Sequence, residues 1–390
     1  MISKEHKKHT DIARPSYGTF GRNEWAFVGG KCHDIKQLAN DVIKGLSAKY
    51  KCAYADAQHH HSDDDVLSSQ PESGAALMYT NHINYQQFDF AKEFDHFGYR
   101  QLFNDADIVL VNGNHFEAKK QVIIIDETKK ASLEKRLAQL TDVELILLAN
   151  NSTEAFDFIK NNIEGYSDLL VYRLDENERI VQFFKDKMEA ATPVVNGLVL
   201  AGGRSVRMGH DKGLIEWHGK AQQYYLADIL EGICNDVYIS CRADQKIAVE
   251  YKKLTDTFIN LGPFGAILSA FREKPNDAWM VIACDLPLLD VAALSYLTEH
   301  RKISSMATSF ESPYNHFPEP LVAIWEPKSY PKLLSFLSQG YNCPGKALRN
   351  MDTHVIQIDD AAKLANVNTI EEFETMRLQL QNHLSNQDAG

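Results

Sequence analysis

The chain of 390 residues is 44% hydrophobic and 24% charged, and its formal net charge is −12 at pH 7. This length predicts two domains, the composition is typical of a soluble globular protein, and the acidic balance argues against a general nucleic-acid or membrane-surface binder. Residues 1–21 contain no apolar signal-peptide core, no apolar run approaches about 20 residues, and the six cysteines include no C-x-x-C pair, so we expect a reduced, cytoplasmic protein.

The N-terminal half alternates predicted strands and helices after a polar tail that ends near residue 20. The predicted strands, which are short apolar runs, cover 24–29, 51–55, 108–112, 121–126 and 144–149. The predicted helices cover 35–47, 132–139 and 153–161. A charged stretch over 177–193 contains an amphipathic turn and leads into a second block of the same kind. We therefore expect two three-layer α/β domains with mostly parallel sheets, covering 1–190 and 191–390.

Three consecutive histidines, His59, His60 and His61, follow the second predicted strand. Imidazole groups are competent metal ligands, but consecutive side chains diverge in an extended chain. We therefore favour a solvated loop over a metal site at this position. The signal Asn112-Gly113-Asn114 is likewise interpreted as a turn without chemistry.

A glycine-rich loop follows the apolar strand predicted over 194–200. The pair Gly202-Gly203 lets the backbone approach a ligand closely, because no Cβ intervenes. Main-chain amides turned inward at such a loop bind anions, and Arg207 and Lys212 add positive charges for phosphate oxygens. The loop has neither the Walker A spacing nor the dinucleotide Gly-x-Gly-x-x-Gly spacing. It therefore predicts a nucleoside triphosphate site of another kind.

The order Leu-Ala-Gly-Gly-x-Ser-x-Arg-Met-Gly-x-Asp-Lys over residues 200–212 closely resembles the signature of the molybdenum cofactor guanylyltransferases. This resemblance implies a Rossmann-like nucleotidyltransferase fold for residues 191–390. It also implies GTP as donor, molybdopterin as acceptor, Mg²⁺ as cofactor and a molybdopterin guanine dinucleotide as product.

Three later segments extend the predicted site. Arg242 follows a strand predicted over 237–240, and ligands gather at the carboxyl ends of strands in open α/β sheets. The resemblance implies that Asn260 holds the nucleoside and that the Gly262-Pro263 turn fixes the loop closing over it, although the same residues also signal an ordinary turn. Asp285 ends a buried apolar strand and falls where the family has its magnesium-binding aspartate; its structural alternative is a helix cap.

Residues 365–372 resemble the family's Asn-x-Asn-Thr-Pro-Glu-Asp segment, with Ile370 in place of the proline. The resemblance implies that Asn366 or Asn368 lies near the metal and the pterin pocket. The structural alternative is a capping box, in which Thr369 caps a helix beginning near Ile370 and Glu372 is its partner. Residues 318–323 resemble the family's acceptor-side strand.

These parts compose one expected reaction, in which a terminal phosphate of the acceptor attacks the α-phosphorus of the triphosphate and pyrophosphate leaves. Arg207, Lys212 and Asp285 are the expected catalytic residues: Arg207 with the two glycines cradles pyrophosphate, Lys212 bridges phosphate oxygens and Asp285 binds Mg²⁺. No general base is needed, because a phosphate monoester is already ionised near neutral pH. The expected nucleotide-binding residues are Leu200, Ala201, Gly202, Gly203, Lys212, Arg242, Asn260, Gly262 and Asp285.

The start of the N-terminal half resembles, over residues 27–38, the GTP-binding adaptor protein of the same pathway. Gly29 and Lys31 match its phosphate loop, but the essential Gly-Lys-Thr falls on Asp34-Ile35-Lys36. The Walker A loop is therefore eroded, and we predict that this half does not hydrolyse nucleotide.

Two alternatives remain open at this point. A molybdopterin cytidylyltransferase or a sugar-phosphate nucleotidyltransferase would keep the fold and the reaction but change the substrates, because Arg242 and Asn260 stand where asparagine and aspartate are expected. A non-catalytic scaffold would instead bind the molybdenum cofactor, a molybdoenzyme or another protein of the pathway.

Overall fold

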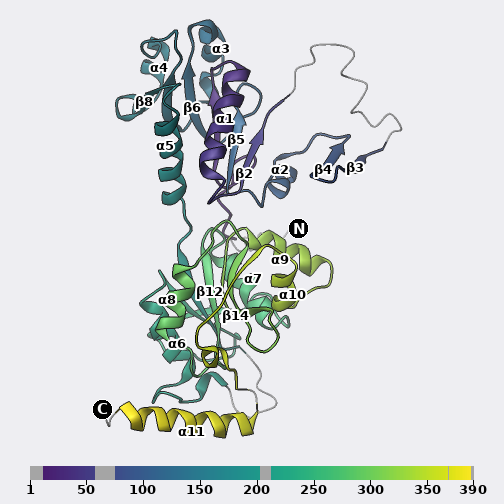
Figure 1. Cartoon of the computed structure of the whole chain (residues 1–390), viewed down its shortest axis with the longest axis vertical. Coiled ribbons are helices and arrows are strands. Elements are labelled where there is room, and N and C mark those ends of the chain that lie inside the picture. Colours follow the sequence, from purple (N-terminus) through teal and green to yellow (C-terminus); the bar gives the residue numbers. More distant parts are fainter. Residues whose placement is uncertain (1–11, 58–74, 203–211, 368, 388–390) are drawn as a thin grey trace, which may run out of the picture. The chain divides into compact units, whose positions relative to one another are not determined.

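The computed structural model describes residues 12–57, 75–202, 212–367 and 369–387 (Figure 1). Contacts divide the chain into an N-terminal unit, Ser16–Ala191, and a C-terminal unit formed by Thr192–Gly390 together with Met1–Pro15. None of the helices in the described ranges combines the length and the apolar composition needed to cross a bilayer.

A six-stranded sheet forms the centre of the N-terminal unit, and all of its neighbouring strands are parallel. Its strands, in spatial order, are β2 (Cys52–Ala55), β5 (Ile108–Asn112), β1 (Glu24–Val28), β6 (Lys120–Ile125), β7 (Val143–Leu148) and β8 (Leu170–Arg173). The central strand β1 is buried along its whole length, because both faces of a parallel sheet are covered by helices.

Helices cover both faces of this sheet (Figure 1). On one face lie α1 (Cys32–Leu46) and α5 (Asn177–Ala190), and Phe184 of α5 packs edge-on against Trp25 and Phe27 of β1. The other face contacts α2 (His96–Leu102), α3 (Lys130–Glu134) and α4 (Asp157–Asn162). Short 3-10 turns are η2 (Glu127–Lys129), η3 (Leu137–Gln139) and η4 (Tyr166–Asp168).

Several N-terminal predictions need correction. The amphipathic turn expected over 177–193 is α5, a helix of 14 residues whose buried stripe of Ile180, Phe183, Phe184 and Met188 follows helical spacing between charged residues. The helix expected over 132–139 is split into α3 and η3, and the helix expected from 153 begins only at Asp157. A separate antiparallel hairpin of β3 (Leu77–Asn81) and β4 (Gln86–Phe90) was not predicted, because both faces are largely exposed and leave no buried alternation.

The C-terminal unit is built on a seven-stranded sheet. In spatial order its strands are β11 (Lys252–Thr255), β10 (Val237–Cys241), β9 (Val195–Leu200), β12 (Ala278–Ala283), β14 (Pro318–Trp325), β13 (Ala307–Glu311) and β15 (Thr353–Ile356). Neighbouring strands are parallel except at β14, which runs antiparallel to both β12 and β13. The expected α/β class with mostly parallel sheets is confirmed.

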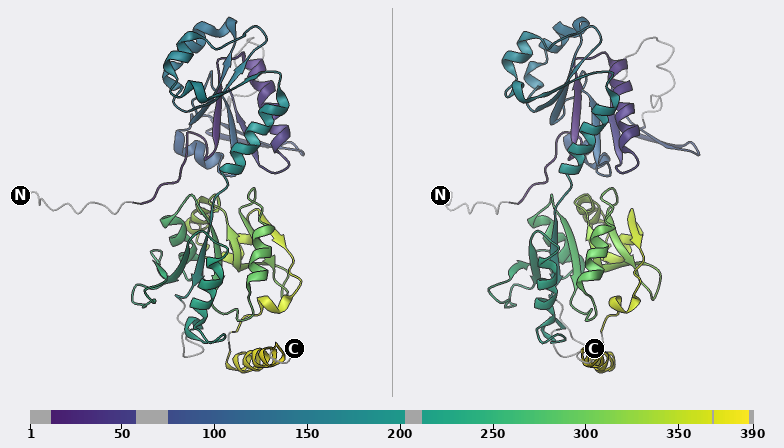
Figure 2. Two further views of the ribbon diagram at one scale, coloured as in Figure 1. Left: turned by 90° about the vertical axis from the view of Figure 1, so that its left-hand side faces the viewer. Right: turned by 60° about the vertical axis from the view of Figure 1, so that its left-hand side comes forward.

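Helices cover both faces of this sheet as well (Figure 2). One face packs on α6 (Gln222–Glu231) and α8 (Val291–Glu299), and the other on α7 (Pro263–Glu273), α9 (Ser329–Ser338) and α10 (Pro344–Arg349). Two 3-10 turns, η5 (Lys212–Leu214) and η6 (Ala361–Leu364), and the terminal helix α11 (Ile370–Gln387) complete the unit.

The capping box expected at the start of α11 is present. The Glu372 amide donates to Thr369 Oγ1 at 3.2 Å, and the Thr369 amide donates to Glu372 Oε2 at 3.1 Å. This reciprocal pair satisfies two amides that the first turn of a helix leaves without partners.

Candidate functional site

A pocket of about 760 Å³ opens at the carboxyl ends of the parallel strands β9, β10 and β12. This is the edge at which open α/β sheets bind ligands. Segments far apart in the sequence meet there, since the strand ends are neighbours in the sheet. The residues of the predicted site that line the pocket are Leu200, Ala201, Gly202, Lys212, Arg242, Asn260, Gly262 and Asp285.

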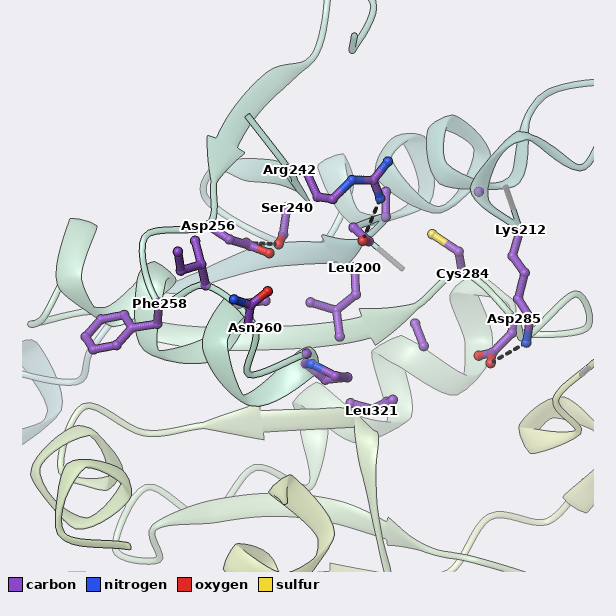
Figure 3. Close-up of a pocket in the computed structure, with 18 of the residues that line it drawn as sticks. Leu200, Lys212, Ser240, Arg242, Asp256, Phe258, Asn260, Cys284, Asp285 and Leu321 are labelled. Atoms are coloured by element: carbon purple, nitrogen blue, oxygen red, sulfur yellow. Dashed lines mark hydrogen bonds and ion pairs between the residues drawn. The ribbon is translucent and has the colours of Figure 1, made fainter. Parts of the chain in front are cut away.

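The pocket has two chemically different ends (Figure 3). Lys212 and Asp285 lie at one end, and Asp256, Phe258 and Asn260 lie at the other. The first end pairs an ammonium with a carboxylate, whereas the second combines a carboxylate, an amide and an aromatic ring. A charged end and a planar-ligand end suit the two halves of a nucleotide.

The ion pair at the charged end joins Lys212 Nζ to Asp285 Oδ2 over 3.4 Å. The two side chains keep 22% and 23% of their surface exposed, so a ligand in the pocket can reach both. Lys212 begins η5, and Asp285 follows β12 by two residues, so the sheet fixes the carboxylate.

The glycine turn after β9 is fastened to the end of β10. Ser240 accepts a hydrogen bond from the Ala201 amide at 2.9 Å, and Arg242 Nη1 donates to the Gly202 carbonyl at 2.9 Å. A Cβ on Gly202 would lie 3.3 Å from Asp256 Oδ2, so the absence of a side chain matters at this position. Arg242 Nε also lies 3.3 Å from Asp244 Oδ1. Arg242 therefore lines the pocket as predicted, and its guanidinium group holds the turn.

Asp256 is a site residue that the sequence analysis missed. Its Oδ1 accepts a hydrogen bond from Ser240 Oγ at 2.6 Å. Burial raises the pKa of the Asp256 carboxyl group, and the hydrogen bond from Ser240 opposes that change. The signal that could have found it is its place immediately after β11, but that strand has only one buried residue, Leu254.

The Gly-Pro turn has the backbone that its sequence predicts. Gly262 has φ 56° and ψ −141°, a conformation open to glycine, and Pro263 is the first residue of α7. Asn260 has φ 62°, which asparagine tolerates better than most residues. This strained loop sets Asn260 and Gly262 in the pocket wall.

The structure describes only one of the two asparagines predicted to lie near the acceptor, Asn366 and Asn368. The amide of Val367 donates to the backbone carbonyl of Asp285 at 2.9 Å, so the segment that contains Asn366 lies beside the end of β12. Asn366 is exposed and does not line the pocket. Gly203, Arg207 and Asn368, together with the histidines at 59–61, lie outside the described residues.

Metal-binding capacity at the site depends on Asp285. Within the described ranges, no group of three or more His, Cys, Asp or Glu side chains could hold a metal ion. Mg²⁺ is commonly bound through one or two carboxylates, with substrate phosphates and waters supplying the other oxygens. Asp285 at the charged end of the pocket fits that donor set, provided that phosphate is bound there as well.

Comparisons with known proteins agree with this architecture. The family described as MobA-like NTP transferase domain matches residues 197–354, the part of the chain that holds Lys212, Asp256 and Asp285. A molybdenum cofactor biosynthesis bifunctional protein from Synechocystis sp. is 30% identical over 236 residues, which are 60% of this chain and 67% of that protein. A molybdenum cofactor guanylyltransferase from Pseudomonas fluorescens is 29% identical over 187 residues, 46% of this chain and 92% of the relative.

Among solved structures, molybdopterin-guanine dinucleotide biosynthesis protein A from Archaeoglobus fulgidus matches 48% of this chain and 99% of its own, with a TM-score of 0.42 and 20% identity. The bifunctional relative, together with the family match, shows the family to which the chain belongs. The chain belongs to the molybdenum cofactor guanylyltransferase family and is a nucleotidyltransferase of molybdenum cofactor biosynthesis.

Proposed function

We propose that the C-terminal unit transfers GMP from GTP to the terminal phosphate of molybdopterin in a Mg²⁺-dependent reaction. The products are molybdopterin guanine dinucleotide and pyrophosphate. The observation that carries this proposal is the convergence of the Gly202 turn, Lys212, Asp256 and Asp285 on one pocket. Relatives named molybdenum cofactor guanylyltransferases support the choice of substrates.

The charged end of the pocket would perform the phosphoryl chemistry. The acceptor phosphate is already an anion near neutral pH, so it attacks the α-phosphorus without help from a general base. Lys212 would contact phosphate oxygens and stabilise the negative charge that grows on the departing pyrophosphate. Asp285 would hold Mg²⁺, which when bound neutralises charge on the phosphates. The amide of Gly202 would face the triphosphate, because no side chain stands in front of it.

The ion pair between Lys212 and Asp285 has a consequence for binding. With the pocket empty of phosphate, each group is the other's counter-charge at 3.4 Å. When Mg²⁺ and a triphosphate enter together, Asp285 gains the cation and Lys212 gains the anion. Nucleotide and metal should therefore bind cooperatively, because the triphosphate brings negative charge to Lys212 and oxygen ligands to the cation on Asp285.

The other end of the pocket would recognise the base. Guanine presents a ring N–H and an amino group on one edge, and the two oxygens of a carboxylate can accept both hydrogen bonds. Asp256 is the half-buried carboxylate at this end, with Ser240 fixing one of its oxygens at 2.6 Å. Phe258 and Asn260 line the wall beside it.

We predict that Asp256→Asn loses preference for guanine. The substitution replaces one acceptor oxygen by an amino group that faces a hydrogen-bond donor of guanine. We therefore expect kcat/KM for GTP to fall about 10- to 100-fold, which is the discrimination that one good bidentate contact provides. Activity with CTP should change much less. The GTP-to-CTP ratio of kcat/KM, measured with molybdopterin as acceptor, checks this prediction, and Asp228→Asn on the outside of α6 is the matched control. An unchanged ratio would mean that Asp256 does not read the base.

The donor itself is tested by product analysis. The purified full-length protein is incubated with Mg²⁺ and molybdopterin, and separately with sugar 1-phosphates, in the presence of GTP or CTP. The expected result is a guanine dinucleotide of molybdopterin. A cytosine dinucleotide would establish a cytidylyltransferase, and a nucleotide sugar would establish a sugar-phosphate nucleotidyltransferase. If the protein forms no product but still binds the molybdenum cofactor, it is a non-catalytic scaffold.

The N-terminal unit should not hydrolyse nucleotide. The connection between β1 and α1 consists of Gly29, Gly30 and Lys31, and the residues aligned with Gly-Lys-Thr, 34–36, lie inside α1. Such a connection cannot wrap a β-phosphate as a Walker A loop does.

A full-length Lys212→Ala/Asp285→Asn double variant isolates this question, because its transferase pocket is disabled. We expect no GTP-dependent phosphate release and no GTP binding by calorimetry. Hydrolysis in the double variant, or tight binding that survives a further Asp256→Asn substitution, would show that the N-terminal unit has a working nucleotide site.

A further inference from the structure

Three neighbouring strands of the N-terminal unit each end in a group with acid–base or nucleophilic chemistry. Cys32 begins α1 directly after the short connection from β1, Asp56 follows β2, and His115 lies three residues after β5. The spatial order β2-β5-β1 places these strand ends side by side. None of these residues belongs to the transferase pocket in the C-terminal unit.

The side chains are in contact. Cys32 Sγ lies 3.4 Å from His115 Nε2, and the same nitrogen lies 3.8 Å from Asp56 Oδ1. His115 keeps only 13% of its side-chain surface exposed. A thiol within reach of an imidazole that is itself beside a carboxylate is the arrangement of a nucleophile and its base.

Asp56 is held in place from two sides. Asn112 Nδ2 donates to Asp56 Oδ1 at 2.8 Å, and Tyr54 OH donates to Asp56 Oδ2 at 2.7 Å. Burial, together with Asp56 and the nearby Cys32, raises the pKa of Tyr54, so this hydroxyl remains a neutral donor. Asp56 is thereby fixed beside the imidazole of His115, and Cys32 is the first residue of the 15-residue helix α1.

The connection before Cys32 is held by the side chain of Asn114. Asn114 Oδ1 accepts from the Gly29 amide at 3.3 Å, and Asn114 Nδ2 donates to the Gly30 carbonyl at 2.8 Å. A Cβ on Gly29 would come within 2.6 Å of the Ile124 carbonyl, so the loop also lies directly against β6. The Gly29 amide of the connection is therefore already engaged, whereas Cys32 itself stays partly exposed.

We propose that Cys32 is a reactive thiol, with His115 as its base, that forms a mixed disulfide with low-molecular-weight disulfides. His115 Nε2 accepts the thiol proton, and Sγ attacks one sulfur of the small disulfide. The bond between the two sulfurs of the small disulfide breaks as the new bond to Cys32 Sγ forms. The departing thiolate takes the proton from His115, so Cys32 is oxidised and half of the small disulfide is reduced.

The other cysteines provide a contrast within the same chain. Burial raises the pKa of Cys52 to about 11 and that of Cys234 to about 12, and burial also raises the pKa of Cys241. These thiols remain protonated and unreactive near neutral pH. Cys343 is exposed at the start of α10, so its rate of modification by a small disulfide is the rate expected from solvent exposure alone.

Peptide mass mapping of the reduced full-length protein after timed exposure to glutathione disulfide tests the proposal. Cys32 is less exposed than Cys343, so access alone would make it the slower of the two. We expect Cys32 to be modified at least about tenfold faster, because its base is in contact with the thiol. Equal rates, or faster modification of Cys343, would overturn the proposal without any variant being needed.

The variant His115→Gln then shows whether the reactivity of Cys32 depends on the imidazole or only on where the thiol lies. Modification of Cys32 should slow by about tenfold or more, while the rate at Cys343 stays the same. His96→Gln, at an exposed histidine of α2 in the same unit, is the matched control and should leave both rates unchanged. Thermal unfolding of each variant shows that the unit is folded, and an unchanged rate at Cys32 in folded His115→Gln would refute the assignment of the base.

Discussion

Asp285→Asn is expected to reduce kcat about 10²- to 10³-fold, the range found when a group that stabilises transition-state charge is removed. The amide has nearly the size of the carboxylate but no charge with which to hold Mg²⁺. Affinity for Mn²⁺ in the presence of a non-hydrolysable GTP analogue should fall in parallel. The rate of dinucleotide formation and a Mn²⁺ titration by electron paramagnetic resonance measure the two effects.

The control for this variant is Asp228→Asn, which breaks an ion pair with Lys220 away from the pocket. Both substitutions remove one member of a Lys–Asp pair, so each should change stability by no more than about 1 kcal/mol. Normal turnover by a folded Asp285→Asn enzyme would remove the metal-binding role from this residue.

Lys212→Ala should lower kcat/KM for GTP about 100-fold, since one full positive charge is lost from the phosphate end of the pocket. The effect on metal binding should have the opposite sign to that of Asp285→Asn. Asp285 loses its cation at 3.4 Å and becomes more available to Mn²⁺, so Mn²⁺ affinity should be retained or increased.

Turnover kinetics and a Mn²⁺ titration in the absence of nucleotide test Lys212→Ala, with Lys220→Ala as the matched control. Lys212→Arg keeps the charge and should retain more activity than Lys212→Ala. A loss of Mn²⁺ affinity in Lys212→Ala would contradict the division of roles, and unchanged kinetics would exclude Lys212 from the reaction.

The pocket is the part of the protein that the sequence predicts best. Its residues come from strand ends, and strands as apolar as β9 and β12 are recognised from their composition alone. The resemblance over 200–212 then indicates which strand ends carry the chemistry. The eight described residues predicted to bind nucleotide all line the same pocket.

Residues whose neighbours decide their role could not be predicted in this way. Asp256 can be recognised as a site residue only from the pairing of β11 with β10, because Lys252 and Lys253 interrupt the apolar pattern by which a strand is predicted. The link from Arg242 to the Gly202 carbonyl depends on a turn that the sequence does not specify. The contact between Cys32 and His115 joins positions that lie 83 residues apart, and the sequence shows only a turn at 112–114.

A crystal structure of the protein with Mn²⁺ and a non-hydrolysable GTP analogue would show directly whether the metal and the nucleotide bind in this pocket. We expect an anomalous manganese peak about 2.0–2.2 Å from a carboxylate oxygen of Asp285, with phosphates beside Gly202 and Lys212 and the guanine edge on Asp256. Nucleotide bound elsewhere, or manganese away from Asp285, would contradict this expectation.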